Sequence, residues 1–398
     1  MKGGPADRTV PLAAAGFAAT AVAFGPARNG YGLFLPHFRE EFGLSTWLLG
    51  LIASGLYAGY LLALSAVGLL VARTGPLPPV LAGLASAAAG MALVALAPNA
   101  SLLAAGVVLA GTSAGWSWAP YNDVAERAVP EGRRGRVLSV VSTGTTFGIL
   151  AAGLAALLAG ADWRAAWSSF AFGAVAAAAL NALVLRGDVG RPAPGGGDPT
   201  ALLGWRWLWR AGTVPLFVVA LSFGVASSFH FSFAVDLVVA SGGFPRAAAG
   251  PFFYAIVGAA GFAGLITGDA ISRFGLPRVL LATLASLGAA AFLLGVAPSF
   301  PPAVGVSAVL FGAGVMVMSA LLSVWSSDAF PERPSAGFSA VLFVFGVGLV
   351  VGPAFLGALA GSLGLSTAFL VSAGVTALTV AARPKDASGD TGGGSGTA

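Results

Sequence analysis

Long uncharged stretches alternate along the chain with short segments that carry nearly all of its ionisable residues. Three of the uncharged runs are 49 residues long, and each contains glycine or proline near its middle: 74–122, 279–327 and 334–382. A helix needs about 20 apolar residues to cross a bilayer. Each run therefore predicts two membrane helices joined by a turn.

Shorter apolar runs predict single membrane helices. They lie at 42–72, 137–161, 165–185, 211–235 and 247–268, with one more at 9–38 that is interrupted only by Arg28. Transmembrane β-strands alternate in polarity, whereas these runs are continuously rich in alanine, leucine, valine and glycine. The pattern thus predicts an all-α integral membrane protein of twelve helices, six before Arg186 and six after it.

Composition agrees with a lipid environment and excludes several kinds of chemistry. Charged residues make up only 9% of the 398 residues, and hydrophobic residues make up 57%. With no cysteine and two histidines, neither a thiolate site nor a metal site built from several imidazoles is expected. Both lysines, Lys2 and Lys385, are terminal, which excludes a GxxxxGK[ST] phosphate loop. We expect no metal and no cofactor.

The basic residues predict how the helices are oriented. With the N-terminus inside, 16 of the 20 basic residues fall on the cytoplasmic side, and only Arg39, Arg164 and Arg246 fall outside. We therefore expect a multi-pass protein of the bacterial inner membrane, monomeric, with both termini in the cytoplasm. The net charge of +5 then reflects topology and anionic lipid, and no nucleic acid partner is expected.

The two halves of the chain repeat each other. At an offset of 200, a loop motif in the first half matches one in the second: Gly68, Arg73 and Gly75 against Gly268, Arg273 and Gly275. At an offset of 204, three span glycines match three others: Gly144, Gly148 and Gly153 against Gly348, Gly352 and Gly357. Glycines at this spacing let helices approach closely. We predict an N-terminal six-helix half (1–190), a cytoplasmic linker with an interfacial helix (191–212), and a C-terminal half with a disordered tail (213–398).

These features resemble the major facilitator superfamily of secondary transporters. The resemblance runs from about Pro11 to Ala382 and includes these motifs: the Gly-x6-Gly loops, Gly348-x3-Gly352-Pro353, Leu35-Pro36 before Phe42-Gly43-Leu44-Ser45, and Asp162-Trp163-Arg164. It implies two pseudo-symmetric bundles that rock about a central site without covalent chemistry. It also implies that the first, fourth, seventh and tenth spans line the cavity.

The loop motifs depart from the family in one respect. The family usually has an aspartate just before the loop arginine, where this chain has Ala72 and Ser272. Asp269, one helical turn before Arg273, is the candidate substitute in the second half. The expected gating residues are Gly68, Arg73, Gly75, Gly268, Asp269, Arg273 and Gly275.

Arg28 is the first candidate for solute binding because it lies inside a predicted span. An arginine within the membrane is by default a functional hypothesis, and its planar fork suits a carboxylate or phosphate. Asn29 and Tyr31 could add hydrogen bonds. Two structural alternatives remain open. The side chain could extend to the headgroups, or it could bond carbonyls freed by Pro26 or Pro36.

His230 is predicted at the depth in the seventh span that Arg28 has in the first. Histidine exchanges protons near neutral pH, so His230 is a candidate for proton coupling as well as for solute binding. The alternative is a buried imidazole without a transport role, packed among neighbouring phenylalanines. Asp236 is the second proton-coupling candidate. It is expected at the periplasmic boundary, where it could pair with a basic residue when the outer gate closes.

Further polar and aromatic residues are candidates for the cavity wall. In the fourth span, Trp118 and Asn122 continue a stripe begun by two glycines. An interfacial aromatic belt is the competing interpretation, especially for Asn122. Ser319 and Ser323 of the tenth span and Tyr254 of the eighth could complete the cavity, although serine in a span often bonds its own backbone.

The sequence favours a proton-coupled or exchanging secondary transporter of a small organic solute, with an anion favoured by Arg28. An exporter of amphipathic compounds is the alternative. A membrane-embedded hydrolase is a third hypothesis, because Gly111-Thr-Ser113-Ala-Gly115 matches GxSxG. No strand precedes this motif, so the glycines are better explained by packing. A non-transporting sensor is a further hypothesis.

Overall fold

The structure, a computed structural model, describes residues 8–160, 162–190 and 212–382, and within them it contains α-helices, three short 3-10 helices and no strand. The N-terminal half contains α1 (Thr9–Phe24), α2 (Pro26–Phe42), α3 (Thr46–Thr74), α4 (Leu77–Ala95), α5 (Ala100–Ser117), α6 (Pro120–Ala128), α7 (Glu131–Ala159), α8 (Trp163–Val184) and η1 (Gly187–Gly190). The C-terminal half contains α9 (Val214–Ala240), α10 (Arg246–Gly261), η3 (Phe262–Ile266), α11 (Thr267–Phe274), α12 (Leu276–Val296), α13 (Pro301–Ala329), α14 (Pro334–Leu363), α15 (Leu365–Thr379) and η4 (Val380–Ala382).

Eleven helical stretches in the described residues are long and apolar enough to cross a membrane. Three of them join consecutive helices, namely α1 with α2, α5 with α6, and α10 with η3 and α11. The twelfth predicted span corresponds to α15, which is apolar but has only 15 residues. The prediction of an all-α multi-pass membrane protein is confirmed. The predicted linker helix within 191–212 lies almost wholly outside the described residues.

The helices extend beyond several of the predicted boundaries. The first stretch continues to Phe42 instead of ending at 38, and α7 begins at Glu131, ahead of the predicted 137. The predicted span boundaries lie at charged residues. Charge limits how much of a helix lies in lipid, but it does not stop the helix from continuing into water. The apolar runs therefore locate the membrane-embedded part of each helix and not its ends.

The first span is broken at Gly25. The backbone turns there between α1 and α2, and Pro26 begins the second helix at a position where a missing N–H costs nothing. A side chain at Gly25 would collide with the backbone of Gly148 in α7. The break therefore lies where two helix backbones touch.

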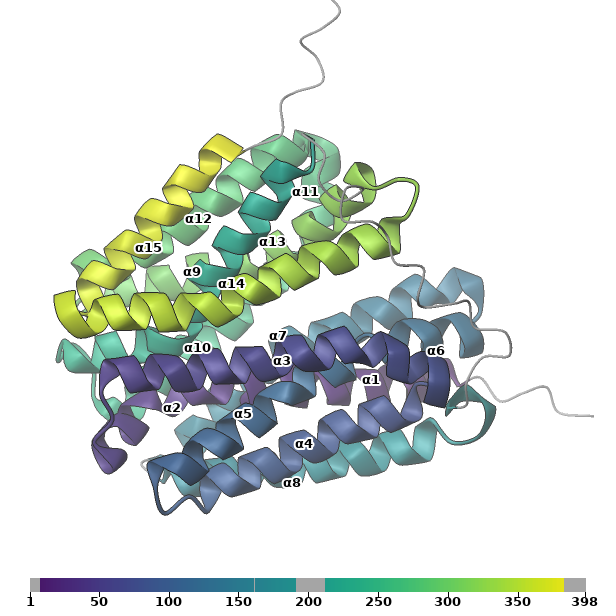
Figure 1. The fold of residues 1–398 in the computed structure, drawn as a ribbon, viewed down its shortest axis with the longest axis horizontal. Helices are drawn as coiled ribbons and strands as arrows, with labels where there is room; N and C mark the ends of the chain where they lie inside the picture. Colours follow the sequence, from purple (N-terminus) through teal and green to yellow (C-terminus); the bar gives the residue numbers. More distant parts are fainter. Residues whose placement is uncertain (1–7, 161, 191–211, 383–398) are drawn as a thin grey trace, which may run out of the picture.

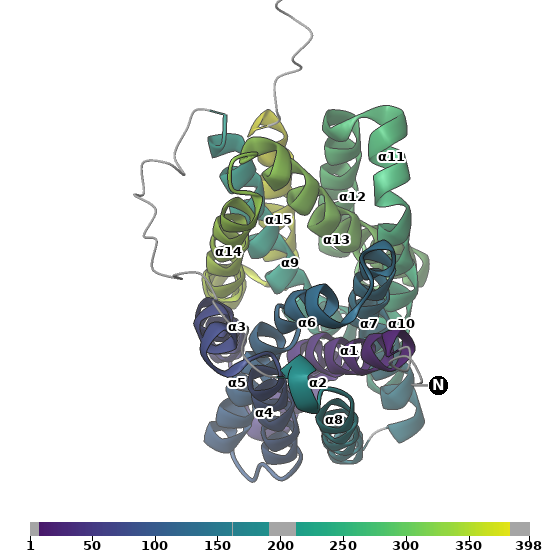
Figure 2. The same cartoon turned by 90° about the vertical axis from the view of Figure 1, so that its right-hand side faces the viewer.

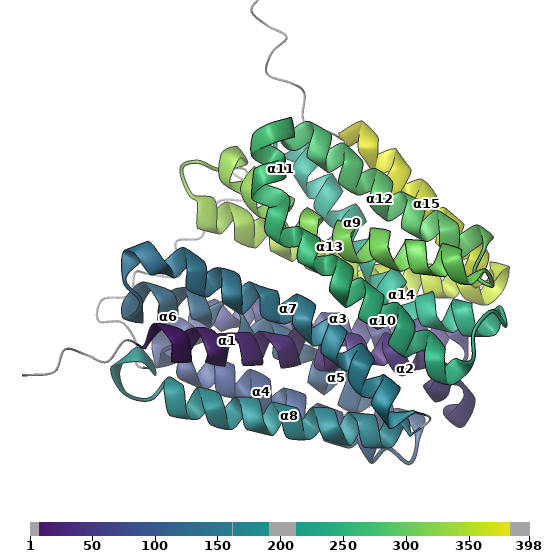
Figure 3. The same ribbon diagram turned by 180° about the vertical axis from the view of Figure 1, so that it is seen from behind.

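The two halves lie one above the other in Figure 1, and each repeats the packing of the other. Gly148 of α7 abuts Ala21 of α1, and its counterpart Gly352 of α14 abuts Val225 of α9. Figure 3 shows α7 crossing α10 on the reverse side. The predicted close approach at the repeated glycines is confirmed.

The same two glycine-rich helices also join the halves. Gly153 of α7 lies against Ala255 of α10, and Gly357 of α14 lies against Gly50 of α3. Each half thus presents its fifth span to the other. This reciprocal contact is what a pseudo-twofold axis between the halves requires.

The loops divide between two ends of the molecule. The Gly43 end contains residues 43–45, 96–99, 160, 162, 241–245, 297–300 and 364, and the Gly75 end contains residues 75–76, 129–130, 275 and 330–333. The ribbons of the two halves diverge toward the Gly75 end (Figure 1). Figure 2 views the molecule from that end, where α6 stands apart from α13 and α14.

The close helix contacts make a testable prediction about stability. Gly148→Ala places a Cβ against the backbone of Ala21, and such overpacking typically costs about 1–3 kcal/mol. We expect a lower melting temperature in detergent by thermal-shift measurement. Gly173→Ala in α8 is the matched control, because a Cβ there meets nothing. An equal effect of both substitutions would show that the contact does not limit stability.

Candidate functional site

Arg28 lies in the first turn of α2, surrounded by aromatic rings. Its Cζ atom is 4.7 Å from the ring centroid of Tyr60 and 5.4 Å from the centroids of Phe24 and Tyr57. Trp118 extends this wall by an edge contact with Phe24, at a centroid distance of 6.3 Å. The aromatic faces attract the cation and hold its plane in place.

No carboxylate of the described residues forms an ion pair with Arg28. The Nε atom is also buried without a hydrogen-bond partner. An uncompensated charge in a membrane-embedded site is costly unless a counterion arrives. The site is therefore electrostatically prepared for an anion.

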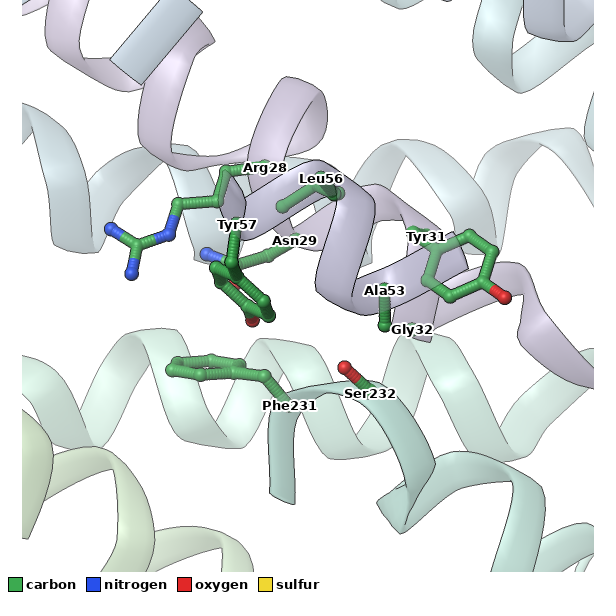
Figure 4. Close-up of a pocket in the computed structure, with 9 residues that line it drawn as sticks. All are labelled: Arg28, Asn29, Tyr31, Gly32, Ala53, Leu56, Tyr57, Phe231 and Ser232. Atoms are coloured by element: carbon green, nitrogen blue, oxygen red, sulfur yellow. The ribbon is translucent and has the colours of Figure 1, made fainter. Parts of the chain in front are cut away.

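The pocket beside Arg28 is formed by both halves. It lies between α2 and α3 of the N-terminal half and Phe231 and Ser232 of α9, and in this conformation it is too narrow to hold a water molecule. Tyr57 interacts through its hydroxyl with both Arg28 and Ser232, across the interface. In Figure 4 the guanidinium extends away from Tyr31. Because Tyr31 lies toward the Gly43 end of α2, the charge is directed toward the Gly75 end.

Three other predicted residues lie at or near this pocket, and their side-chain donors are hydrogen-bonded to backbone carbonyls. Asn29 Nδ2 donates to the Phe24 carbonyl at 2.5 Å, and Tyr31 Oη donates to the Leu49 carbonyl at 2.9 Å. Tyr254 Oη donates to the Phe231 carbonyl at 2.7 Å. Asn29, and not Arg28, thus satisfies a carbonyl freed at the α1–α2 break. The Oδ1 atom of Asn29 remains buried without a partner.

His230 lies in a different pocket. Its ring stacks on Phe311 at a centroid distance of 3.8 Å and also contacts Phe253 and Phe369. This pocket lies within the C-terminal half, between α9, α12, α13 and α15, and its volume of about 10 Å³ leaves room for about one water molecule. The imidazole Nε2 is buried and has no partner. Successive residues of a helix point about 100° apart, so Phe231 faces Arg28 while His230 does not.

The predicted stripe on the fourth span is interrupted. Because α5 ends at Ser117 and α6 begins at Pro120, Trp118 and Asn122 do not continue one helical face. Trp118 joins the aromatic wall of Arg28, whereas Asn122 is exposed. The interpretation of Asn122 as a cavity residue is therefore not supported by its position.

The predicted serines also lie away from the Arg28 pocket. Ser319 is exposed and its Oγ donates to the Val315 carbonyl at 2.8 Å, while Ser323 is half-buried. Ser113 is fully buried and its Oγ has no partner. The imidazole of His230 packs among phenylalanines of the other half, so it is not placed to act as a base for Ser113.

An ion-pair latch joins the halves at the Gly43 end; it consists of Arg39 and Glu40 of α2, Asp236 of α9 and Arg246 of α10. Arg39 Nη2 lies 2.6 Å from Asp236 Oδ2, and Arg39 Nε donates to Oδ1 at 3.0 Å. Arg246 pairs with Glu40. Asp236 is almost fully buried, and its predicted pairing with a basic residue is present. The sequence had treated Arg39 and Arg246 only as external charges.

The predicted gating loops have the same geometry in both halves. Gly75 and Gly275 both have φ of +81°, which favours glycine. Arg73 and Arg273 are exposed at the Gly75 end, and so are Gly68, Gly268 and Asp269. Among the residues that the structure describes, Asp269 forms no ion pair with Arg273. Asp269 therefore does not take the place of the missing aspartate in this conformation.

Comparisons with known proteins agree with this architecture. A family model of the Major Facilitator Superfamily matches residues 15–270 and 259–394. A variant of the nucleoside transporter NupG has a TM-score of 0.76 at 12% identity, covering 94% of this chain and 98% of its own. A bacterial homologue of the human lysosomal transporter Spinster, in an inward-facing and occupied conformation, has a TM-score of 0.74 at 15% identity, covering 96% and 97%. No curated protein matches the chain.

The structural likeness at these identities shows the fold, and the family model shows the family. Its match spans nearly all of the described residues and includes both six-helix halves. The family consists of carriers, not enzymes. This chain therefore belongs to the Major Facilitator Superfamily of membrane transporters.

Proposed function

We propose that the protein is a secondary active transporter that carries a small organic anion by alternating access, coupled to protons or to exchange. The observation that carries the proposal is Arg28, a cation with no counterion among the described residues, in a pocket formed by both halves. An anion entering there would neutralise the charge and bind α2 and α9 at once.

The latch and the divergence of the halves support one step of the cycle. The Gly43 end is closed by the pairs Arg39–Asp236 and Glu40–Arg246. The guanidinium of Arg28 is directed toward the other end (Figure 4). With the positive-inside orientation, the Gly75 end faces the cytoplasm of a bacterial inner membrane. This conformation would then exchange solute with the cytoplasm.

Asp236 is the favoured proton-coupling group. Protonation would remove the charge that Arg39 binds, so a proton would release the latch and open the Gly43 end. His230 is the second candidate, because its Nε2 is buried without a partner. Its pocket lies within one half, so a proton there has no direct contact with the latch.

Transport in liposomes tests the proposal. The purified protein should accumulate an organic anion in response to an imposed proton gradient, or exchange it against internal anion. Failure to move any solute of a broad panel in either assay would overturn the proposed function. A neutral amphipathic compound, transported better than any anion, would instead favour the exporter, for which the aromatic wall of Phe24, Tyr57 and Tyr60 is the supporting observation.

Two conservative substitutions should separate the coupling candidates. We expect Asp236→Asn to remove the dependence of uptake on the proton gradient while anion exchange continues. We expect His230→Gln to retain that dependence. The measurement is initial uptake rate at several pH gradients. Loss of proton dependence in His230→Gln alone would transfer the coupling role to the pocket of the C-terminal half.

A further inference from the structure

We infer that the Arg28 pocket selects monovalent carboxylates attached to an aromatic or flat apolar body, and that it rejects dianions and neutral analogues. This inference rests on the proposed function and names its substrate class. Three observations carry it: the number of charges in the pocket, the unpaired Nε of Arg28, and the chemistry of the surrounding side chains.

The charge count comes first. Arg28 is the one charged residue among those that line the pocket in the described part of the chain. The next cation along α2, Arg39, is already bonded to Asp236, with side-chain contacts of 2.6 and 3.0 Å. A single negative charge is therefore neutralised. A second one would remain uncompensated in a site of low dielectric, which is strongly unfavourable.

The buried, unpaired Nε of the guanidinium favours one type of anion. The rings of Phe24, Tyr57 and Tyr60 surround the guanidinium, with their centroids 4.7–5.4 Å from Cζ. The unpartnered Nε lies on the edge of the guanidinium plane. A carboxylate accepts two parallel hydrogen bonds from such an edge. Phosphate monoesters offer similar oxygens but carry about −1.5 to −2 charges at pH 7, and the charge count disfavours them.

The walls select the body of the solute. Tyr57 lines the pocket from α3 and Phe231 lines it from α9. Phe24 and Tyr60 pack around the Arg28 guanidinium, and Trp118 contacts Phe24. The polar atoms of Asn29 Nδ2, Tyr31 and Tyr254 are engaged with backbone carbonyls. Few donors or acceptors are thus left for a strongly hydroxylated solute such as a sugar acid. A ring or another flat apolar group fits these walls better.

The test uses four matched probes that differ in one property each. Phenylacetate is the expected ligand, phenylacetamide lacks the charge, phenylmalonate adds a second carboxylate, and acetate lacks the ring. Affinity is measured by thermal shift of the purified protein and by competition in counterflow exchange. We expect phenylacetate to bind at least about tenfold more tightly than each of the others. Phenylacetamide loses the charge-assisted hydrogen bonds, acetate loses the ring burial, and phenylmalonate brings a second, uncompensated charge.

Variants show where the selection arises. Arg28→Gln should bind phenylacetate and phenylacetamide equally, and Tyr60→Leu should reduce the preference for phenylacetate over acetate. Equal or tighter binding of phenylmalonate or phenylacetamide by the unmodified protein would overturn the inference. If the protein exchanges other solutes while ignoring phenylacetate, the transport function stands and this substrate class is wrong. If nothing is exchanged, the proposed function itself fails.

Discussion

Replacing Arg28 with glutamine is expected to lower organic-anion transport by about 10- to 100-fold. A hydrogen bond to a charged group contributes about 1.5–3 kcal/mol, and Arg28 is the charged residue of the pocket. The measurement is counterflow exchange in liposomes at equal amounts of inserted protein. Transport by Arg28→Lys should fall between that of the unmodified protein and that of Arg28→Gln, because lysine keeps the charge and loses the planar fork.

A stability measurement on the same variants separates a binding role from a structural one. Arg28 has no carboxylate partner in the part of the chain that the structure describes, so its removal leaves no buried anion there. We therefore expect the melting temperature of Arg28→Gln to be unchanged or higher in the absence of solute. Normal anion transport by this variant, or a large loss of stability with transport lost in parallel, would contradict the assignment of Arg28 to solute binding.

Breaking the ion-pair latch is expected to open the Gly43 end. The chain contains no cysteine, so Ser232→Cys provides a single thiol at a position that is 3% exposed. With Asp236→Asn added, we expect labelling by a membrane-impermeant maleimide from the Gly43 side to rise about tenfold. Loss of one partner of a buried pair leaves the other uncompensated. Arg39 is 31% exposed, so the effect should be smaller than for a fully buried pair.

The chain offers a matched control for this experiment. Arg164 pairs with Glu41 at 2.5 Å, also at the Gly43 end but within the N-terminal half. Arg164→Gln should therefore leave labelling unchanged. The exchanged pair, Arg39→Asp with Asp236→Arg, should restore protection. Equal labelling with and without Asp236→Asn would show that this pair does not close the Gly43 end.

The sequence predicted the architecture well because the controlling physics is local. Charged side chains are excluded from lipid, so uncharged runs located the spans. The repeated glycines located the close contacts, such as Gly148 with α1 and Gly352 with α9. These inferences need only the residues of one helix and the properties of a bilayer.

Helix breaks were not predictable in the same way. Pro36, Pro251 and Pro353 lie inside helices, whereas Pro26 and Pro120 begin new ones. Proline alone does not distinguish these outcomes. At Gly25 the break coincides with contact against Gly148, a partner more than a hundred residues away. The break before α6 lies between Trp118 and Asn122, which the sequence pattern assigns to one stripe.

The sequence predicted how deep the candidate residues lie in the membrane, but not which way their side chains point around each helix. Arg28 lines a pocket between the halves, and Asp236 pairs with the basic residue Arg39. The matching depth of His230 did not bring it to Arg28, because depth fixes position along a helix and not the direction of a side chain around it. Tyr57 and Tyr60 could have been found from their spacing of three residues in the second span, which places both on one face.

Rocking of the two halves around the Arg28 pocket is the central prediction, and spin-label distances test it directly. Gly68 and Gly268 at the Gly75 end have no neighbours within 4 Å of an added Cβ. Leu96 and Phe300 at the Gly43 end are 75% and 58% exposed. In Asp236→Asn, the 68–268 distance should shorten and the 96–300 distance should lengthen. Changes of the same sign at both ends, or no change at either, would contradict alternating access in this protein.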